Sequence, residues 1–372
     1  MNNECVEKED GNTSSPKLIK SVFLALLAGL LINVFMGLLV DFGELGTAFK
    51  EASVVSVATP FLLIFVIYIV DSFRYQLIFR KFDVKLSFRD GLYNNIIGYF
   101  FSNITPGSVG GQPFQVYHFA KLGLDSTVSS NIVFSRLIES NFVQLLIVIL
   151  FFHKGIGMMA GIGKGAYLLG AGMIITIVAT VVLVLGFLNP HFLGVIALKL
   201  EKSWLGKLIA KLTKDRCWAE KMSVWSQGLG EGFKVLWSKN MISMLLDILI
   251  FMVEQIFWAM TLYVPLCILT GVAQPFPEFL LSFILCGLVS LFIPTPGAAG
   301  SIEASYLLVL SALTGKPAAT MSAILIWRFG VYYVHLLVGG LVYFFIPMRK
   351  AVYTLGENGV LRHIRPDRRN RS

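Results

Sequence analysis

Long apolar runs separated by short polar segments dominate this sequence. An α-helix needs about 20 residues to cross the ~30 Å hydrocarbon core of a bilayer. Six runs reach that length, and they lie at residues 19–40, 53–73, 127–152, 166–188, 241–264 and 318–346. The pattern therefore predicts an all-α polytopic membrane protein with six full spans.

Two further apolar regions, 91–121 and 278–315, are interrupted near their middles by similar segments. The first break is Asn103–Gly110 (NITPGSVG) and the second is Ile293–Gly300 (IPTPGAAG). Proline and glycine break helices, and the remaining pieces of roughly 15 residues are too short to span a bilayer. We expect each region to form a re-entrant hairpin that returns to the side from which it entered.

Composition and charge support this membrane assignment and give an orientation. Apolar residues make up 56% of the chain and charged residues 14%, against about 25% charged in soluble domains. With a cytosolic N-terminus, 25 of the 31 Lys and Arg residues lie on the cytosolic side and four in outer loops, as the positive-inside rule predicts. We therefore expect a multi-pass plasma-membrane protein with both termini in the cytosol, and the net charge of +9 does not require nucleic-acid binding.

The order of spans and hairpins is the same in two halves of opposite orientation. Each half reads span, span, hairpin, span, so the predicted architecture is an inverted repeat with opposed hairpins whose tips approach at mid-depth. Such a repeat supplies two similar gates for alternating access. The predicted regions are a disordered cytosolic tail at 1–18, membrane repeat 1 at 19–152, an outer loop at 153–165, membrane repeat 2 at 166–346 with an amphipathic cytosolic insertion at 190–240, and a basic cytosolic tail at 347–372.

Two arginines, Arg136 and Arg328, fall inside spans at corresponding places in the two halves. A charge within a bilayer needs a partner or a wet cavity. Glu139, three residues along the same helix, is the expected partner of Arg136, and Glu303 or Glu254 that of Arg328. The arginines either hold spans together as fixed ion pairs or bind a lipid phosphate through their planar donor fork.

Further polar positions lie on the spans of the second half. Asp247 and Glu254 share nearly one helical face; we expect Asp247 to lie at the interface and Glu254 deeper, where it can receive a cationic headgroup or a proton. Arg328, Tyr332 and His335 follow helical spacing on the last span, and we interpret His335 as a hydrogen-bonded packing residue.

The hairpin breaks offer a second kind of anion site. Free amides at the start of each second helical piece can bind phosphate, near Gly107–Gly111 and Gly297–Gly300, unless Asn103, Thr105, Thr295 or Ser301 caps them. The candidate substrate residues are Arg136, Arg328, Glu139, Glu254, Glu303, Asn103, Pro106, Gly107, Gly110, Gly111, Gln112, Pro296, Gly297, Gly300 and Tyr332.

Other chemistry is not indicated. The four cysteines and five histidines show no metal-binding spacing, and no nucleophile triad emerges. The glycine-rich segment 155–165 lacks the Lys-Ser/Thr ending of a phosphate-binding loop. We therefore expect no metal site, no cofactor, and no ATP hydrolysis.

The segments Asn103–Tyr117, Arg136–Glu139 and Pro294–Glu303 resemble the signatures of the lysylphosphatidylglycerol synthase transmembrane, or flippase-like, family. The resemblance covers most of 19–346. It implies a membrane domain that moves aminoacylated phospholipid, which in fused members precedes a soluble aminoacyltransferase domain. That domain is not expected here, so we expect no enzyme activity. Many members have an acidic residue directly after the glycine that Gly110 matches, whereas this chain has Gly111-Gln112 there. This chain also has Gly297-Ala298 where a glycine pair is common.

The expected function is the flipping of a phosphate-bearing amphiphilic lipid between leaflets. Aminoacylated phosphatidylglycerol, polyprenyl lipids and glycolipids are all compatible, and the expected partners are membrane lipids, not nucleic acid. Broken helices and buried arginines also fit a secondary transporter of a soluble anion. A third reading is a non-transporting membrane subunit that partners a separate lipid aminoacyl- or glycosyltransferase.

Overall fold

A computed structural model describes residues 52–108, 110–189, 241–290 and 295–348, with short stretches and single positions elsewhere. In the N-terminal half it contains α3 (Val54–Lys81), α4 (Phe88–Ile104), α5 (Gly111–Lys121), α6 (Ser126–Leu150), α7 (Phe152–Met159) and α8 (Gly165–Leu188). The C-terminal half contains α12 (Met241–Thr270), α13 (Phe276–Ser290), α14 (Ser301–Thr314), α15 (Pro317–Arg328), the π-helix η1 (Phe329–Tyr333) and α16 (Val334–Phe345). A two-stranded antiparallel sheet, β1 (Tyr353–Leu355) with β2 (Leu361–His363), is the departure from all-helical structure.

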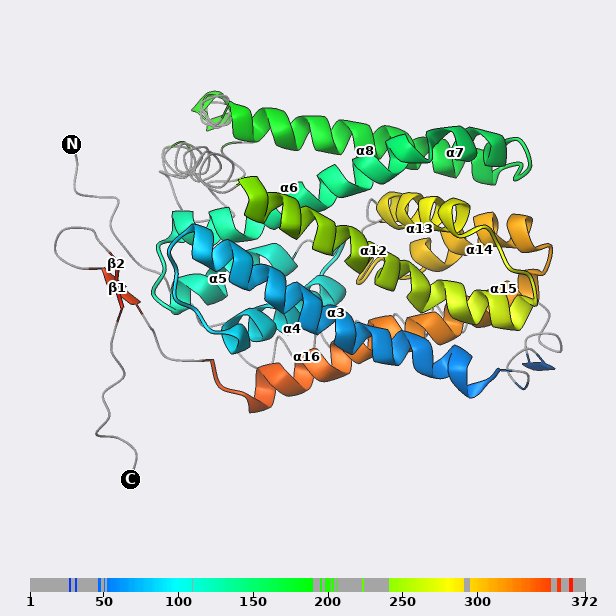
Figure 1. Cartoon of the computed structure of the whole chain (residues 1–372), viewed down its shortest axis with the longest axis horizontal. Helices are drawn as coiled ribbons and strands as arrows, with labels where there is room; N and C mark the ends of the chain where they lie inside the picture. The colour runs from blue at the N-terminus through cyan, green and yellow to red at the C-terminus, as the bar shows by residue number, and fades with distance from the viewer. Residues whose placement is uncertain are drawn as a thin grey trace.

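The membrane-protein prediction is confirmed at the level of helices. Among the described residues, five helical segments are long and apolar enough to cross a bilayer, and they coincide with five of the six predicted spans. The sixth, at 19–40, lies outside the described residues, as do the predicted tail at 1–18 and most of the amphipathic insertion at 190–240. Figure 1 shows the described helices.

Two of the spans differ in detail from their predictions. Helix α3 continues to Lys81, eight residues past the predicted end at 73, because Asp71 and Arg74 are buried against neighbouring helices. The last span is not one regular helix: α15 passes into η1 and then into α16. A π-helical turn of this kind often marks a functional site.

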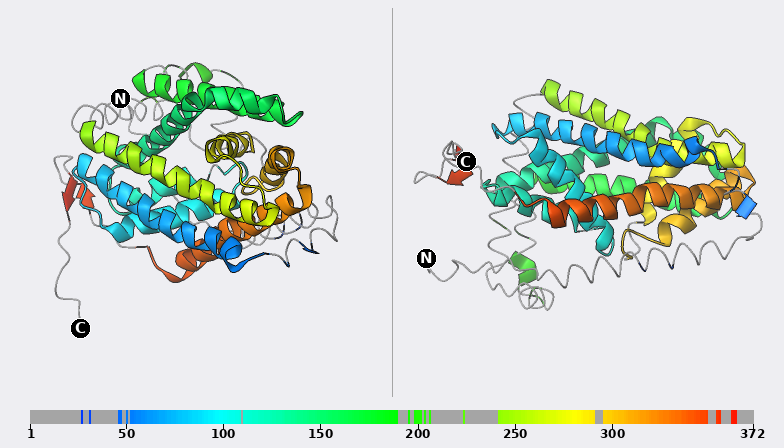
Figure 2. Two further views of the ribbon diagram at one scale, coloured as in Figure 1. Left: turned by 45° about the vertical axis from the view of Figure 1, so that its right-hand side comes forward. Right: turned by 90° about the horizontal axis from the view of Figure 1, so that it is seen from below.

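The long helices α3 and α12 lie side by side at the centre (Figure 1), and every other described span contacts one of them directly or through a hairpin. In the first half α3 packs on α4, α4 on α5, and α5 on α6. In the second half α12 packs on α13, α13 on α14, and α14 on α15. The same sequence of contacts therefore occurs in both halves. Figure 2 shows the long helices running side by side along the long axis in its right-hand view.

The first hairpin, α4–α5, begins and ends at the same end of the bundle. Val84 and Leu86 precede α4, Leu122 and Leu124 follow α5, and all four belong to one buried cluster together with Met244 near the start of α12. The loops on both sides of this hairpin are therefore packed against each other.

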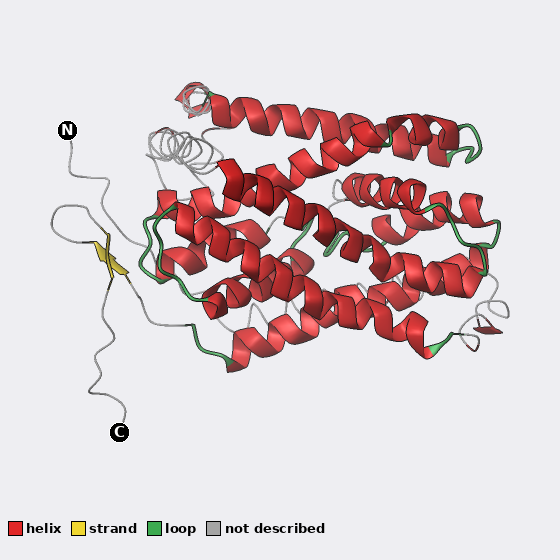
Figure 3. Cartoon of the chain, viewed as in Figure 1, coloured by secondary structure: helices red, strands yellow, loops and turns green. Residues whose placement is uncertain are grey.

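The second hairpin, α13–α14, begins and ends at the opposite end. Lys316, which follows α14, donates from Nζ to the carbonyl of Thr270 at the end of α12 at 2.7 Å. Gln274, which precedes α13, donates to the carbonyl of Leu313 at 3.0 Å. Met244 and Thr270 lie near opposite ends of a 30-residue helix, so the two hairpins start from opposite ends of the bundle. Figure 3 shows loop segments at both ends and further loop segments inside the helical assembly.

Candidate functional site

The two Pro-Gly breaks contact each other, with Pro106 exposed and Pro296 half-buried. Pro106 and Pro296 form an isolated antiparallel β-bridge, and the Gly107 amide donates to the Thr295 carbonyl at 3.3 Å. Each break separates two helices that are too short to span a bilayer alone. The predicted approach of the hairpin tips is therefore present as a direct backbone contact, which we call the tip junction.

Both tips turn in the same way. Gly107 and Ser108 have φ of +62° and +58°, and Gly297 and Ala298 have φ of +56° and +50°. Two successive left-handed residues at matching positions are uncommon, because this region costs a residue with a Cβ about 1–2 kcal/mol. The shared Thr-Pro-Gly sequence thus gives the same strained turn at both tips.

Tyr332 closes one side of the tip junction. It is 1% exposed, and its ring lies against Gly297 so closely that a Cβ on Gly297 would sit 2.3 Å from a ring carbon. The same added Cβ would lie 3.0 Å from the Asn103 side-chain oxygen, so Asn103 also borders the junction. Glycine at 297 is therefore required by space as well as by its positive φ.

Arg328 lies beside the tip junction and pairs with Glu303. Its Nε donates to Glu303 Oε1 at 2.7 Å, its Nη2 donates to the Gly297 carbonyl at 3.4 Å, and its guanidinium lies 4.5 Å from the centre of the Tyr332 ring. Glu303 uses its other oxygen to accept from the Gly300 amide at 2.6 Å, which caps α14. Of the two predicted partners of Arg328, Glu303 is confirmed and Glu254 is wrong, because Glu254 faces α3 instead.

Side chains cap both freed helix starts; the predicted cap Thr105 is confirmed at the first break, whereas Glu303 takes the place of the predicted Thr295 or Ser301 at the second. Thr105 Oγ1 accepts from the Gly110 amide at 2.9 Å, and Glu303 does the same for Gly300. Gly111 allows α5 to pack on α4, since a Cβ there would lie 2.2 Å from the Ser102 hydroxyl. Gln112 is half-buried in the first turn of α5. The first amide at each break is thus already occupied by protein.

A second polar region, absent from the sequence prediction, centres on Arg74 of α3. Arg74 is 1% exposed and forms ion pairs with carboxylates on three helices. These carboxylates are Asp247 at 2.9 Å, Asp71 at 3.2 Å, Glu254 at 3.2 Å and Glu139 at 3.5 Å. One guanidinium thereby ties α3, α6 and α12 together.

Arg136 pairs differently from the prediction. It forms an ion pair with Asp71, donates to Asn95 Oδ1 at 3.1 Å, and lies 3.9 Å from the centre of the Tyr75 ring. Glu139 is not its ion-pair partner, because Glu139 points to Arg74. The i,i+3 spacing permits a pair within α6, but packing against α3 and α4 supplies better-placed partners for both residues.

The expected interfacial position of Asp247 is also wrong. Its side chain is fully buried and accepts from Arg74 Nε. The sequence contains a signal for this region: the apolar pattern of α3 continues past residue 73, which places Asp71 and Arg74 inside the helix with i,i+3 spacing. Lys81 Nζ contacts Met244 of α12, one helical turn before Asp247. We call the group Asp71, Arg74, Lys81, Arg136, Glu139, Asp247 and Glu254 the charge cluster.

Tyr99 of α4 lies between the tip junction and the charge cluster. Its hydroxyl donates to Asp71 Oδ2 at 3.2 Å, and its carbonyl accepts from Asn103 Nδ2 at 3.0 Å. Its ring stacks on His335 with centroids 4.6 Å apart. His335 hydrogen-bonds Tyr68 through Nδ1, so its predicted packing role agrees with the contacts. One aromatic residue therefore touches both polar regions.

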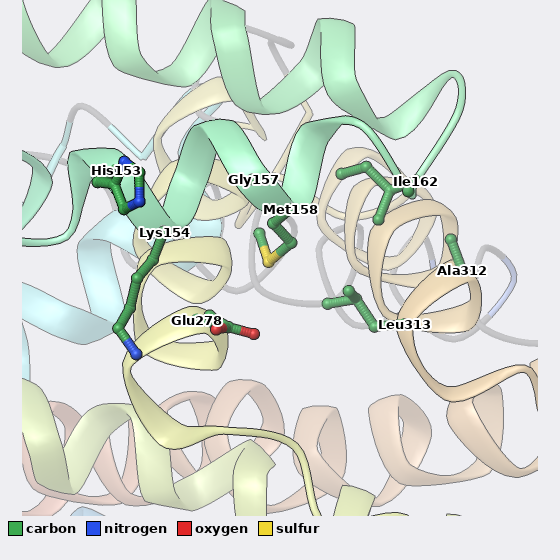
Figure 4. A pocket seen from close by; sticks show the side chains of 9 residues that line it. His153, Lys154, Gly157, Met158, Ile162, Glu278, Ala312 and Leu313 are labelled. Atoms are coloured by element: carbon green, nitrogen blue, oxygen red, sulfur yellow. The ribbon is translucent and has the colours of Figure 1, made fainter.

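A separate open pocket lies between α7, the loop after it, α13 and α14. Its lining residues are His153, Lys154, Gly157, Met158, Gly161, Ile162, Glu278, Ala312 and Leu313. Figure 4 shows Lys154 and Glu278 at its polar side and Met158, Ile162 and Leu313 at its apolar side. The predicted substrate residues do not line it.

The structure thus gathers the predicted residues into two groups. The tip junction holds Asn103, Pro106, Gly107, Pro296, Gly297, Gly300, Glu303, Arg328 and Tyr332, whereas the charge cluster holds Arg136, Glu139 and Glu254. No curated protein is detectably similar in sequence to the chain. Residues 22–339 match the family described as the lysylphosphatidylglycerol synthase TM region, and the chain belongs to this family.

Proposed function

We propose that this protein moves a phosphate-bearing amphiphilic lipid between the two leaflets by alternating access, with the two hairpins as opposed re-entrant gates. The observation that carries the proposal is the tip junction, in which Pro106 bridges Pro296. Irregular backbone at membrane depth is tolerated where protein or a water-filled cavity satisfies its polar groups. Transporters built from inverted repeats place their binding sites at such breaks.

The packing of the hairpin ends supports the opposed gates. The first hairpin returns to the end where α12 starts, and the second to the end where α12 finishes. In the proposed orientation the first opens to the cytosol and the second to the outside. Separation of the tips on one side then exposes the junction to that side, while the other hairpin remains packed.

The assignment to lipid rests on the family and on the surface of the spans. The family description names a lipid synthase membrane region, which favours a membrane lipid over a soluble solute. The faces of α3, α8 and α12 expose large apolar side chains, including Leu62 at 64%, Ile174 at 64% and Leu249 at 57%. These faces suit contact with acyl chains while a polar headgroup passes the junction.

Arg328 is the proposed phosphate ligand. It already reaches the Gly297 carbonyl at the tip, and its bond to Glu303 uses Nε and leaves the rest of the donor fork for other acceptors. Because charge-assisted arginine–phosphate bonds are strong and directional, a lipid phosphate can compete for this guanidinium when the tips part. Glu303 then keeps its bond to the Gly300 amide.

Reconstitution into liposomes tests the proposal. Purified protein would be reconstituted with headgroup-labelled lysylphosphatidylglycerol, phosphatidylglycerol or polyprenyl phosphate, and a membrane-impermeant quencher would report label that reaches the outer leaflet. We expect protein-dependent movement of at least one phosphate-bearing lipid above the rate in protein-free liposomes.

A matched pair of variants separates transport from leakage. Gly297→Val forces a side chain against the Tyr332 ring at the tip and should abolish movement, whereas Gly170→Val, at a position with nothing within 4 Å of an added Cβ, should retain it. If none of the lipids moves while a radiolabelled soluble anion is taken up, the protein is a secondary transporter of that anion and the hypothesis of lipid flipping is wrong. If neither moves and an enzyme co-purifies, the subunit reading is favoured.

A further inference from the structure

The charge cluster contains more negative than positive groups. Its carboxylates are Asp71, Glu139, Asp247 and Glu254, and its cations are Arg74, Arg136 and Lys81. With every group ionised, four negative charges face three positive ones. Apart from the half-buried Lys81, these side chains are almost fully enclosed, with at most 11% exposure. An uncompensated charge in such a place costs several kcal/mol.

The carboxylate oxygens that lack a partner belong to Glu139 and Asp247. Among the described residues, both oxygens of Glu139 and Oδ2 of Asp247 are buried without a hydrogen-bond partner. Arg74 Nη2 lies 3.5 Å from Glu139 Oε2, but without hydrogen-bond geometry. Asp247 Oδ1 accepts from Arg74, whereas Asp71 accepts from Tyr99 and Arg74 and Glu254 accepts from Arg74, and neither of these two has a buried oxygen without a partner among the described residues.

The Glu139 and Asp247 carboxyl groups lie beside the same guanidinium, with Asp247 Oδ1 2.9 Å from Arg74 Nε and Glu139 Oε2 3.5 Å from Arg74 Nη2, so they are neighbours. Two carboxylates are both acceptors, so they cannot bond without a proton between them. Two carboxylates that share a site also disfavour simultaneous ionisation. One added proton therefore removes the repulsion, supplies the missing donor and brings the cluster to charge balance.

We infer that the charge cluster is a proton-binding site that holds one proton between Glu139 of α6 and Asp247 of α12. The proton comes from water and adds to one carboxylate oxygen, which gives a neutral carboxyl group whose O–H donates to the other carboxylate. No other bond changes. Release returns the proton to water and restores both carboxylates.

The surrounding groups decide the occupancy of this site. From α3, the positive charges of Arg74 and Lys81 stabilise the ionised form of both carboxyl groups. Asp71, also on α3, forms an ion pair with Arg136. From α12, Glu254 adds a further negative charge that Arg74 shares. Asn95 of α4 contributes a neutral donor-acceptor that is bound to Arg136. Since Arg74 is divided among four carboxylates, it does not fully neutralise any of them.

The site is placed to influence the gates. Asp71 joins the cluster to Tyr99, and Tyr99 accepts from Asn103 at the tip junction. A change of charge at Glu139 and Asp247 alters how strongly the Arg74 guanidinium interacts with Asp71. A link between this proton and lipid movement rests on the proposed function, whereas the proton site itself does not.

Infrared difference spectroscopy of the full-length protein in liposomes tests the proton directly. The carbonyl stretch of a protonated carboxylic acid is separate from that of a carboxylate and shifts in D2O. We expect such a band at neutral pH, and we expect its loss in both Glu139→Gln and Asp247→Asn, because an amide N–H then replaces the shared proton. Glu278→Gln, in the separate pocket, is the matched control and should keep the band.

The substituted amides preserve a donor to the remaining carboxylate, so both variants should elute as monodisperse protein. Absence of the band in the wild type, or its survival in both variants, would overturn the proton site. In the flipping assay, an imposed pH gradient should change the wild-type rate and not that of Glu139→Gln. If the band behaves as expected but no lipid moves, the proposed function fails and the proton site stands.

Discussion

Arg74 and Asp247 connect the two central helices of the bundle through a fully buried ion pair, with Nε and Oδ1 2.9 Å apart. The pair joins α3 of the first half to α12 of the second, and the same guanidinium also reaches α6 through Glu139. Arg74 is therefore the residue through which three helices of the bundle share charge.

Removal of Arg74 should be the most damaging single arginine substitution. Arg74→Gln leaves up to four carboxylates without their cation, and loss of one partner of a buried ion pair costs about 3–5 kcal/mol. We expect a marked fall in the midpoint of thermal aggregation, measured by size-exclusion chromatography after heating in detergent. Arg80→Gln is the control, because Arg80 lies exposed in the last turn of α3. Equal stability of the two variants would contradict the central role of Arg74.

The packing of the loops predicts the topology of the first hairpin. Single cysteines at Lys85 and Lys121, in a background without the native cysteines, should be labelled from the same side of the membrane, because their neighbours Val84, Leu86 and Leu122 belong to one buried cluster. Cysteines at Lys164 and Lys316 should be labelled from the opposite side. Impermeant maleimide on right-side-out and inverted vesicles measures this. Opposite labelling of positions 85 and 121 would make α4–α5 a full crossing.

The sequence predicts the frame of this protein well because hydrophobic length and helix-breaking residues are local properties. Five spans and both breaks appear where the apolar runs and the Pro-Gly pairs place them. The contact between the tips also agrees with the sequence prediction that the two hairpin tips approach each other.

The partners of buried charges are not predictable in the same way. Glu139 lies one turn from Arg136, yet it faces Arg74 of another helix. The choice depends on the rotation of α6 against α3 and α12, which is set by packing along their whole length. The π-helix η1 is likewise not predictable from local sequence. Its wider turn changes the rotation of the helix between Arg328 and His335, so that Tyr332 faces Gly297 and His335 faces Tyr68.

Arg328→Gln should separate transport from folding. Glutamine keeps a hydrogen-bond donor for Glu303, and Glu303 retains the Gly300 amide, so a monodisperse protein is expected. Without the charge, movement of phosphate-bearing lipid in liposomes should fall by about tenfold or more, as expected for loss of ~1.5–3 kcal/mol from a charge-assisted bond. Normal movement by a folded variant would show that Arg328 is structural.

Arg136→Gln should destabilise the protein through Asp71, its ion-pair partner, and not through Glu139. The double variant Arg136→Gln with Asp71→Asn removes both charges and should recover part of the stability lost in the single variant. Thermal midpoints of the two singles and the double form a double-mutant cycle that measures this coupling. A coupling of zero would indicate that the pair contributes nothing to stability.

Gly297→Ala should strain the second tip. The new Cβ would lie 2.3 Å from the Tyr332 ring and would sit at a φ of +56°, so we expect a loss of about 2–4 kcal/mol from overpacking and backbone strain together. Adding Tyr332→Ala relieves the overpacking but not the φ penalty, and should recover part of the stability. Gly157→Ala, where an added Cβ meets nothing within 4 Å, is the control. Thermal midpoints again provide the measurement.

A disulfide across the tip junction should stop transport reversibly. Pro106 and Pro296 are paired as antiparallel bridge partners, whose Cα atoms are typically about 4.5–5.5 Å apart, within the range that a disulfide spans. Pro106→Cys with Pro296→Cys, in the background without native cysteines, should cross-link on mild oxidation. If the tips must part in each cycle, oxidised protein should lose lipid movement and reductant should restore it.

Each single-cysteine variant controls for the loss of proline and should be insensitive to oxidant. Undiminished movement by a fully cross-linked protein would show that the tips do not separate during transport, and the hairpins would then not be the gates.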